Sequence, residues 1–338
     1  MSKSVKVGIV GLGTVGSGTV NVLQRNAEEI ASRVGRPCDI SHIGARRDNP
    51  NCDITGIKGS RDVFAVAADP DVDILVELIG GTTTARDLIL QAIANGKHVV
   101  TANKALIAEH GNEIFTAAHA KGVDVAFEAS VAGGIPILRS LREGLAGNHI
   151  ESVYGIMNGT TNYVLTQMEA TGEPFDVVVK RAQDLGYAEA DPSFDLDGVD
   201  AAHKLTLLVA MAFGADLTYK EISTEGIRGL TPVDFAAAAE FGYRIKLLGI
   251  AKAHRGSDGE ESIEARVHPT MIPATSLLAN VDGAMNAVAV TGDFVGPTLF
   301  YGAGAGELAA REVWRRRGVE TWPGGSRTRT VGRSCTAT

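Results

Sequence analysis

The sequence is poor in cysteine and has no long apolar segments. Its 338 residues include three cysteines, Cys38, Cys52 and Cys335. Three cysteines are too few for a framework of disulfide bonds. No apolar run approaches the roughly 20 residues that a membrane-spanning helix needs. These shortages argue against a disulfide-stabilised secreted domain and against a helical membrane protein.

Positive charge is also in deficit. The chain has 32 lysines and arginines against 40 aspartates and glutamates, which gives a formal net charge of −8. A balance of this sign argues against a general nucleic-acid binder. The opening segment, MSKSVKVGIV, is a short polar lead into a strand and not a secretory signal. We therefore expect a cytoplasmic protein that binds neither nucleic acid nor membrane.

Length and composition are those of a soluble enzyme with two domains. Apolar residues make up 44% of the chain and charged residues 21%, which is ordinary for a globular protein. The length allows two substantial cores. The patterns along the chain predict a nucleotide-binding domain at residues 1–128 and a substrate-binding, catalytic domain at 129–301. A glycine-rich return loop and an atypical tail are expected at 302–338.

A glycine-rich turn follows the first apolar strand. Residues 5–10 form that strand, GLGTVG occupies 11–16, and a helix with apolar positions through Ile30 comes next. The first glycine allows a tight turn, the second lets the backbone approach a pyrophosphate, and the third permits close helix–strand packing. The helix N-terminus adds N–H donors. A bare glycine motif is weak, but this context supports dinucleotide binding over a plain turn. The predicted contacts are Gly11, Gly13, Thr14, Val15 and Gly16.

The residues after the second strand bear on cofactor choice. This strand, at 39–44, is followed by Arg46, Arg47 and Asp48. A site specific for NAD usually has an acid at the end of this strand to accept from the ribose 2′-hydroxyl. Here Asp48 lies beyond two arginines, which instead suit a 2′-phosphate. We predict NADP as the cofactor, with NAD possible. The alternative is a pair of solvated loop arginines.

Further strands at 71–81, 97–104 and 123–129 alternate with helices in the first domain. One helix is expected to be capped by Thr82–Thr84 and to run through Ala94. This rhythm predicts a Rossmann-type, doubly wound parallel sheet. Lys104 lies at the strand end that faces the ligand crevice in such sheets, so it is a candidate site residue. The alternative is an ordinary exposed loop lysine.

The chain changes character after Glu128. A loop of small residues at 129–136 leads into a helix expected at about 137–145. Glu128 and the carbonyls of this loop could form an oxygen-only site for a hard cation, or the glutamate could simply cap a turn. A strand at 150–156, a helix at 160–168 and strands near 263–268 and 286–290 predict an α+β second domain.

An acidic stretch precedes one lysine on an apolar helix. We expect four carboxylates in a loop and the helix to begin near Val199. Asp200 and Lys204 are four residues apart and share one helix face. Burial lowers the pKa of a lysine, which lets it serve as a general acid or base. An acidic mouth suits a small substrate with an ammonium group, whereas the alternative is a solvated salt bridge. The carboxylates are Glu189, Asp191, Asp195, Asp197 and Asp200.

Together these segments resemble homoserine dehydrogenases over roughly residues 5–308. The resemblance rests on GLGTVG at 11–16, VVTANKALIA at 99–108, EASVAGGIPI at 128–137, GIMNGTTNYVL at 155–165, LGYAEADPSFDLDGVDAAHKL at 185–205 and RGLTPVDF at 228–235. It implies interconversion of L-aspartate 4-semialdehyde and L-homoserine with NAD(P)H, in the biosynthesis of threonine, methionine and isoleucine. It also implies a homodimer or a dimer of dimers, formed through the second domain.

The resemblance assigns roles to individual residues. Lys204 would donate the proton to the aldehyde oxygen, and Asp200 would orient the substrate or a catalytic water. Glu189 and Asp195 would bind the ammonium and hydroxyl ends of the substrate. Lys104 would lie near substrate and nicotinamide. The remaining implied contacts are Gly159 and Thr160 in the substrate pocket, Gly186, Glu189 and Gly302 at the cofactor, and a sodium site of Glu128 with the carbonyls of Val131, Gly133 and Ile135.

The tail departs from the family pattern. From Ala309 the sequence is rich in arginine and lacks lysine, where the family continues as an apolar helix. We expect a short helix there and then disorder. The chain is too short for the regulatory ACT domain of many bacterial members, so we expect no inhibition by threonine.

Three other functions compete with this interpretation. An acylating semialdehyde dehydrogenase would need a nucleophilic cysteine in the second domain, but Cys38 and Cys52 lie in the first domain and Cys335 in the tail. Another lysine-assisted NAD(P)-dependent dehydrogenase of a small amino acid is the second alternative. A non-catalytic dinucleotide-binding sensor is the third, and it would not require the pair of Asp200 and Lys204.

Overall fold

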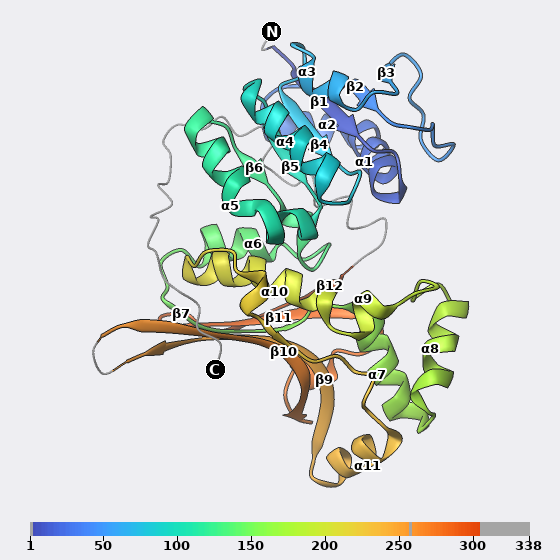
Figure 1. The fold of residues 1–338 in the computed structure, drawn as a ribbon, viewed down its shortest axis with the longest axis vertical. Coiled ribbons are helices and arrows are strands. Elements are labelled where there is room, and N and C mark those ends of the chain that lie inside the picture. The colour runs from blue at the N-terminus through green and yellow to red at the C-terminus, as the bar shows by residue number, and fades with distance from the viewer. Residues whose placement is uncertain (1–2, 257–258, 305–338) are drawn as a thin grey trace. The chain divides into compact units, whose positions relative to one another are not determined.

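The computed structural model describes residues 3–256 and 259–304, which fall into two compact units divided between Gly134 and Ile135 (Figure 1). The division follows the domain boundary expected at Glu128 by a few residues. Each unit contains one sheet of six strands within these residues. The helix and disorder expected beyond Ala309 lie outside the described residues. None of the described helices is long and apolar enough to cross a membrane.

The first unit is a parallel sheet with helices on both faces. Its strands run in the order β3-β2-β1-β4-β5-β6 and all pair in parallel. This is the order of dinucleotide-binding sheets, so the predicted doubly wound fold is confirmed. The strands are β1 (Val5–Val10), β2 (Cys38–Gly44), β3 (Lys58–Ser60), β4 (Ile74–Glu77), β5 (His98–Thr101) and β6 (Val125–Ala126).

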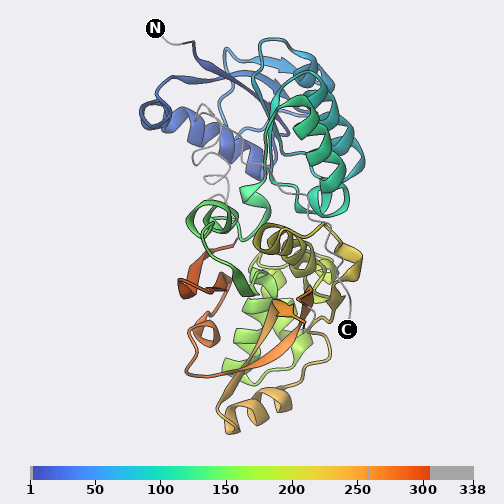
Figure 2. The same ribbon diagram turned by 90° about the vertical axis from the view of Figure 1, so that its left-hand side faces the viewer.

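Helices cover the sheet because the central strands are apolar on both faces. Ile9 of β1 and Val76 of β4 on one face, and Val10 of β1 and Leu75 of β4 on the other, are fully buried, as expected for interior parallel strands. Figure 2 shows α1 on one side of the sheet and α4 with α5 on the other. The helices of this unit are α1 (Thr14–Arg25), α2 (Ala27–Val34), α3 (Phe64–Ala68), α4 (Thr83–Ala94) and α5 (Lys104–Lys121), and a 3₁₀ turn follows at Glu128–Ser130.

Three local predictions for this unit need correction. The helix expected to run through Ile30 is broken at Asn26, whose φ and ψ angles of −106° and 22° depart from helical values and end α1. The strand expected at 71–81 is limited to β4. Thr82 occupies the N-cap position of α4, but its side chain makes no capping hydrogen bond. In the first two cases the periodicity indicated the right element and misplaced its end, whereas α4 ends at Ala94 as predicted.

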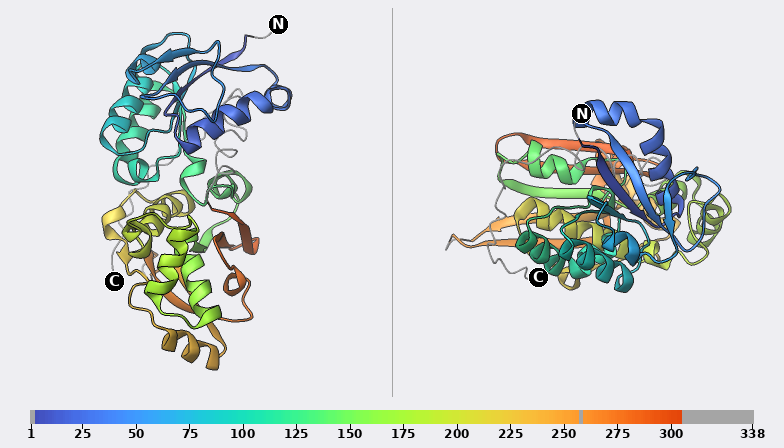
Figure 3. Two further views of the ribbon diagram at one scale, coloured as in Figure 1. Left: turned by 90° about the vertical axis from the view of Figure 1, so that its right-hand side faces the viewer. Right: turned by 90° about the horizontal axis from the view of Figure 1, so that it is seen from above.

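The second unit packs helices on a mostly antiparallel sheet, which confirms the predicted α+β domain (Figure 3). The strand order is β12-β11-β7-β9-β10-β8, and only β8 pairs in parallel, with β10. Its strands are β7 (Ile150–Ile156), β8 (Ser223–Thr224), β9 (Tyr243–Arg255), β10 (Glu261–Pro273), β11 (Met285–Gly292) and β12 (Gly296–Ala303). Helix α7 packs against β9 and β11, and helix α10 packs against β7 and β9.

Helix α10 is the apolar helix expected to begin near Val199. It runs from Val199 to Phe213 between Gly198 and Gly214, whose φ angles are 81° and 67°. Positive φ suits glycine at such boundaries. The other helices are α6 (Ile137–Arg139), continued by a π-helical turn (Ser140–Gly144), α7 (Gly159–Thr171), α8 (Phe175–Asp184), α9 (Ser193–Leu196) and α11 (Pro232–Glu240), with 3₁₀ turns at Tyr219–Glu221 and Leu278–Asn280.

Three features of this unit differ from the sequence prediction. Strand β9 is absent from the predicted strands. The glycine-rich return loop expected from 302 begins inside β12, because Gly302 pairs with Asn286 of β11. Asp195, expected in a loop, lies in the short helix α9. Strand β9 pairs with the distant β7, and β12 pairs with β11 in a hairpin. Local periodicity reports neither pairing.

Candidate active site

The glycine turn after β1 has the geometry that phosphate binding requires. Gly11 has a φ angle of 99°, and a Cβ there would lie 2.5 Å from the carbonyl oxygen of Leu78. A Cβ at Gly16 would overlap the carbonyl oxygen of Gly11, whereas Gly13 faces open space. Thr14 and Val15 form the first turn of α1. The turn therefore leaves backbone N–H groups accessible at a helix N-terminus, which fits a pyrophosphate.

The end of β2 carries an ion pair that the sequence did not reveal. Arg46, Arg47 and Asp48 are exposed there. Arg61, which follows β3, donates from Nη1 and Nη2 to the two carboxylate oxygens of Asp48 at 2.9 and 2.8 Å. These hydrogen bonds hold the pKa of Asp48 below its ordinary value. Arg46 and Arg47 have no ion-pair partner within the described part of the chain.

Lys104 is the first residue of α5 and is half-buried. The turn before it is fixed by Asn103. The Asn103 side chain accepts from the N–H of Leu106 at 3.2 Å and donates to the carbonyl of Gly81 at 2.7 Å. Lys104 is thereby held where β5 ends. This is the edge of the sheet at which ligands bind in folds of this type.

The loop after Glu128 turns sharply at non-standard backbone angles. Ala132 and Gly133 have φ angles of 52° and 46°, in a region that L-residues rarely adopt. The side chains of Val131 and Ile135 are buried, so their backbone carbonyls carry the polar character of the loop. No group of three or more His, Cys, Asp or Glu in the described residues could hold a metal ion. A site here would depend on Glu128 and carbonyl oxygens.

The second unit contains a largely buried lysine that is held by one carboxylate and one backbone carbonyl. Lys204 Nζ donates to Asp200 Oδ2 at 2.7 Å and to the carbonyl oxygen of Met157 at 2.6 Å. The side chains of Lys204 and Asp200 are 12% and 5% exposed. Such exposure distinguishes this pair from a solvated i,i+4 salt bridge. The Met157 carbonyl also accepts from Asn286 Nδ2 of β11 at 3.0 Å, which fixes its position.

Asn158 joins the two buried carboxylates, and sequence reasoning did not select it. Its Nδ2 donates to Asp195 Oδ1 at 2.6 Å and to Asp200 Oδ2 at 2.8 Å. Its Oδ1 accepts from the N–H of Thr161 at 2.8 Å and caps α7. Asparagine at an N-cap is a local signal, but its second role becomes visible only in the fold. The N-cap of α7 therefore holds the carboxylates of α9 and α10 together.

Asp195 has an electrostatic environment unlike that of its neighbours in sequence. Burial, followed by the nearby Asp200 carboxylate, raises its pKa above the ordinary value, against opposing hydrogen bonds from Asn158 and Thr160. Asp191 instead accepts from the hydroxyl of Ser193 at 2.6 Å. Asp197 accepts from Arg228. Two of the predicted carboxylates, Asp195 and Asp200, thus meet at Asn158, and Asp200 alone contacts Lys204.

The loop after α8 carries the other predicted residues. Gly186 and Glu189 are exposed, and Gly186 has a φ angle of 77°. Gln183 Nε2 donates to the carbonyls of Glu189 and Ala190 at 3.1 and 3.2 Å. Thr160, in the first turn of α7, donates to the carbonyl of Tyr187 at 2.8 Å. These hydrogen bonds fix the backbone of the loop. Among the described residues, no hydrogen bond links the Glu189 carboxylate to Asp195 or Asp200.

Two glycines near the site are required by packing. A Cβ at Gly159 would lie 2.8 Å from the carbonyl oxygen of Ala284, and one at Gly302 would lie 3.1 Å from the side chain of Ile135. Gly159 lets the start of α7 approach the turn before β11. Gly302 lets β12 approach the side chain of Ile135, the first residue of the unit. Both positions have a structural reason for glycine whether or not a ligand contacts them.

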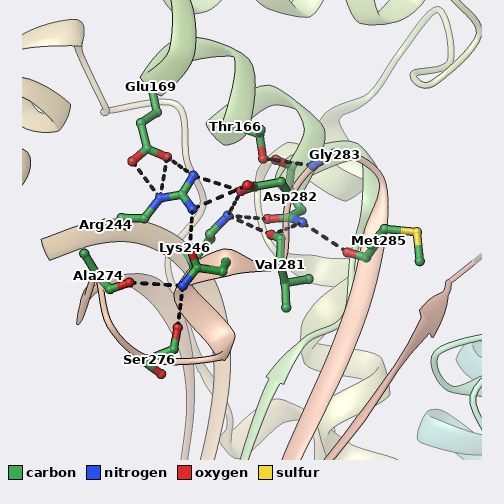
Figure 4. Close-up of polar contacts among 12 residues, drawn as sticks. Thr166, Glu169, Arg244, Lys246, Ala274, Ser276, Val281, Asp282, Gly283 and Met285 are labelled. Carbon is green, nitrogen blue, oxygen red and sulfur yellow. Dashed lines mark hydrogen bonds and ion pairs between the residues drawn. The ribbon is translucent and has the colours of Figure 1, made fainter.

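A partly buried ion cluster fixes α7 on the sheet (Figure 4). Arg244 of β9 donates to both carboxylate oxygens of Glu169 on α7, at 2.8 and 2.7 Å, and to Asp282 at 2.9 Å. Fully buried Lys246 donates to the Val281 carbonyl at 2.7 Å and to Asp282 at 3.0 Å. Burial lowers the pKa of Lys246, partly offset by Asp282. This cluster secures the helix whose N-cap is Asn158.

Comparisons with known proteins converge on one family. Residues 136–312 match the family model "Homoserine dehydrogenase", and residues 11–128 match "Homoserine dehydrogenase, NAD binding domain". The homoserine dehydrogenase of Pseudomonas aeruginosa is 58% identical over 304 residues, which cover 90% of this chain and 69% of the relative. That of Neisseria gonorrhoeae is 53% identical over 313 residues, with the same two coverages of 90% and 69%.

Solved structures give the same result. A homoserine dehydrogenase from Thiobacillus denitrificans aligns with a TM-score of 0.88 and 57% identity over 92% of this chain and 72% of that one. A hyperthermophilic archaeal homoserine dehydrogenase in complex with NADPH aligns with a TM-score of 0.74 and 24% identity over 92% of this chain and 96% of that one. The second comparison supports the fold alone.

Proposed function

The chain belongs to the homoserine dehydrogenase family of NAD(P)-dependent oxidoreductases, which interconvert L-aspartate 4-semialdehyde and L-homoserine, and from this we propose the roles of its residues. We assign Lys204 as the proton donor to the aldehyde oxygen. The observation that carries the assignment is a nearly buried ammonium group held by two fixed acceptors, Asp200 and the Met157 carbonyl.

The geometry at Lys204 leaves a donor for the substrate. A lysine ammonium has three N–H donors, and two of them point to Asp200 and Met157. Within the described residues the third has no partner. A bound nicotinamide supplies the hydride when the carbonyl is reduced. Lys204 then places a proton at the carbonyl oxygen as negative charge develops there, which is general acid catalysis.

We propose that Asp195 and Glu189 bind the ammonium and hydroxyl ends of the substrate, with Asp195 at the ammonium group. The raised pKa of Asp195 reflects its burial and the repulsion from Asp200. A cationic group beside Asp195 relieves that repulsion and favours the ionised carboxylate. Asp200 holds Lys204 and so orients the proton toward the substrate. Gly159 and Thr160, in the first turn of α7, line the substrate pocket in this assignment.

The glycine turn of the first unit is proposed to hold the cofactor pyrophosphate. A Cβ at Gly11 or Gly16 would collide with backbone, whereas Gly13 faces open space. The three glycines therefore fit the pyrophosphate of the dinucleotide that the family uses. The other proposed cofactor contacts are Thr14, Val15, Lys104, Gly186, Glu189 and Gly302. We further propose NADPH as the preferred cofactor over NADH, because the exposed Arg46 and Arg47 follow β2.

A structural sodium ion is proposed in the loop after β6. Its ligands would be the carboxylate of Glu128 and the carbonyl oxygens of Val131, Gly133 and Ile135. The support is a sharp turn at Ala132 and Gly133, in which the apolar side chains are buried and the carbonyls are the polar groups. Hard cations take oxygen ligands of this kind.

Assembly and location follow as proposals from the family and the composition. A homodimer or dimer of dimers through the second unit, and a cytoplasmic location, agree with a biosynthetic enzyme of low cysteine content. Sedimentation of the purified chain would give its mass in solution.

The direct test of the activity is NADPH oxidation on addition of L-aspartate 4-semialdehyde. Wild-type protein should turn over, and the reverse reaction should reduce NADP with L-homoserine. Turnover with another small amino acid, but not with homoserine, would favour the alternative lysine-assisted dehydrogenase. Nucleotide binding without turnover of either substrate would favour the non-catalytic sensor.

A further inference from the structure

A cavity of about 170 Å³ lies at the carboxyl ends of β2 and β3 in the first unit. Leu12 of the glycine turn contributes to it, which places the cavity next to the proposed pyrophosphate site. The other lining residues are Ile43, Ala45, Asp48, Ile54, Gly59, Ser60 and Arg61. In parallel nucleotide-binding sheets the adenosine ribose of the cofactor binds at this end of the second strand.

The cavity wall contains both kinds of residue that distinguish NAD from NADP. An acid at this position accepts a hydrogen bond from the ribose 2′-hydroxyl, and an arginine nearby binds a 2′-phosphate. Asp48 and Arg61 supply one of each, joined by two hydrogen bonds of 2.9 and 2.8 Å. Arg46 and Arg47 follow Ala45 of the cavity wall and are exposed outside it, so they would add positive charge around a 2′-phosphate that Arg61 binds directly.

Arg61 is held at the cavity independently of Asp48. Its Nη1 also donates to the carbonyl of Ala45, at the end of β2, at 3.2 Å. The strand before it, β3, has three residues and is fixed by contacts with Asp69. Lys58 of β3 and buried His42 of β2 each contact the carboxylate of Asp69 at 2.7 Å. This anchor sets the position of β3, and so the place where Arg61 emerges.

We propose that Asp48 and Arg61 together select the cofactor, with Arg61 binding the 2′-phosphate of NADP and Asp48 accepting from the 2′-hydroxyl of NAD. The inference rests on the proposed dinucleotide binding at the glycine turn. A phosphate competes with Asp48 for the planar fork of Arg61, which matches both anions. A ribose hydroxyl instead donates to Asp48, whose paired oxygens keep further lone pairs. The pair thus lets one site accept both cofactors.

The test measures nucleotide binding by titration calorimetry, with AMP and 2′-phospho-AMP as the two probes. Arg61→Ala should weaken 2′-phospho-AMP roughly ten- to a hundredfold, the range for charge-assisted hydrogen bonds, and leave AMP nearly unchanged. Asp48→Asn should act in the opposite direction, strengthening 2′-phospho-AMP and weakening AMP. Arg86→Ala is the matched control, because Arg86 pairs with Glu113 between α4 and α5 of the same unit.

Each outcome decides the proposal. Equal weakening of both probes by Arg61→Ala, or the same change in Arg86→Ala, would overturn the role of Arg61. If Arg61→Ala is unfolded by circular dichroism, Asp48→Asn decides by the sign of its effect on the two probes. Failure of the wild-type chain to bind either probe would remove the nucleotide site itself, and this inference with it. Binding of both probes with no selective change in either variant would remove the inference alone.

Discussion

Lys204 Nζ and Asp200 Oδ2 lie 2.7 Å apart, one helical turn along α10, in a largely buried setting. The two residues are close in sequence, yet their hydrogen bonds involve residues that are distant in sequence. Asn158 donates to the same carboxylate oxygen, and the Met157 carbonyl accepts from the same ammonium. Asp200 is therefore the link between the N-cap of α7 and the proposed acid. Changing it should affect orientation without removing the proton donor.

Asp200→Asn should lower kcat about tenfold or more, because a neutral amide replaces one charge-assisted hydrogen bond to Lys204. Asp197→Asn is the control, because this substitution removes the same charge from the same segment. Asp197 pairs with Arg228 and not with Lys204. Steady-state reduction of L-aspartate 4-semialdehyde measures both. Equal kcat values for the two variants would contradict an orienting role for Asp200.

Arg46→Ala combined with Arg47→Ala should raise the KM for NADPH and change that for NADH little. The reason is that both side chains are exposed beyond β2, where a 2′-phosphate is the group they suit. Initial rates with each cofactor provide the comparison. Equal loss with both cofactors would argue against the assignment of these two arginines.

Stability at low pH should depend on Asp69. Lys58, then the backbone N–H of Asp71 and His42, lower its pKa from 3.8 to about 2, against the opposing effect of burial. A lowered folded-state pKa stabilises the protein above the unfolded value near 4, and this contribution is lost as pH falls toward 2. It amounts to at most about 2 kcal/mol, since Lys58 is exposed.

Urea unfolding of wild type and Asp69→Asn at pH 7 and at pH 3 measures this contribution. The difference in the free energy of unfolding between the two proteins should be largest at pH 7 and smaller at pH 3. Asp124→Asn, an exposed carboxylate beside His98, provides a comparison with a solvated partner. A difference that is constant with pH would show that ionisation of Asp69 is not the source.

Glu128→Gln should abolish any stabilisation by sodium, because Glu128 is the charged ligand in the proposed set. Wild-type Tm should rise by a few degrees when sodium replaces lithium at constant ionic strength, as about 1 kcal/mol would produce. The variant should show no such rise. An equal response of both proteins to sodium would place the ion elsewhere or remove it.

The sequence predicted what depends on local pattern. The strand before Gly11 and the helix after it follow from an apolar run and a glycine motif, and the structure contains both. Strand β9 was missed because Arg244 and Lys246 interrupt its apolar character. Their partners, Glu169 and Asp282, are distant in sequence and meet them only in the folded unit.

The candidate site shows the same division. Lys204 and Asp200 share a helix face that spacing alone predicts. The contact of Asn158 with Asp195 joins residues 37 apart, and that of Arg61 with Asp48 depends on β2 and β3 being neighbours in the sheet. Such contacts arise from topology, so a pattern of residue types along the chain does not contain them.

The kcat of Lys204→Ala shows whether Lys204 provides the proton. General acid catalysis contributes about 10²–10⁴-fold, so kcat should fall by that factor. Affinity for NADPH should hardly change, since the proposed phosphate contacts lie on the glycine turn. Lys204→Arg should not restore activity, because an arginine does not release its proton near neutral pH.

A folded Lys204→Ala variant, with a native circular dichroism spectrum, that retains more than about half of the wild-type kcat would exclude Lys204 as the proton donor. Even the low end of the range for general acid catalysis would then be absent. The pair of Lys204 and Asp200 would be a structural salt bridge, and Lys104 would become the next candidate for the acid.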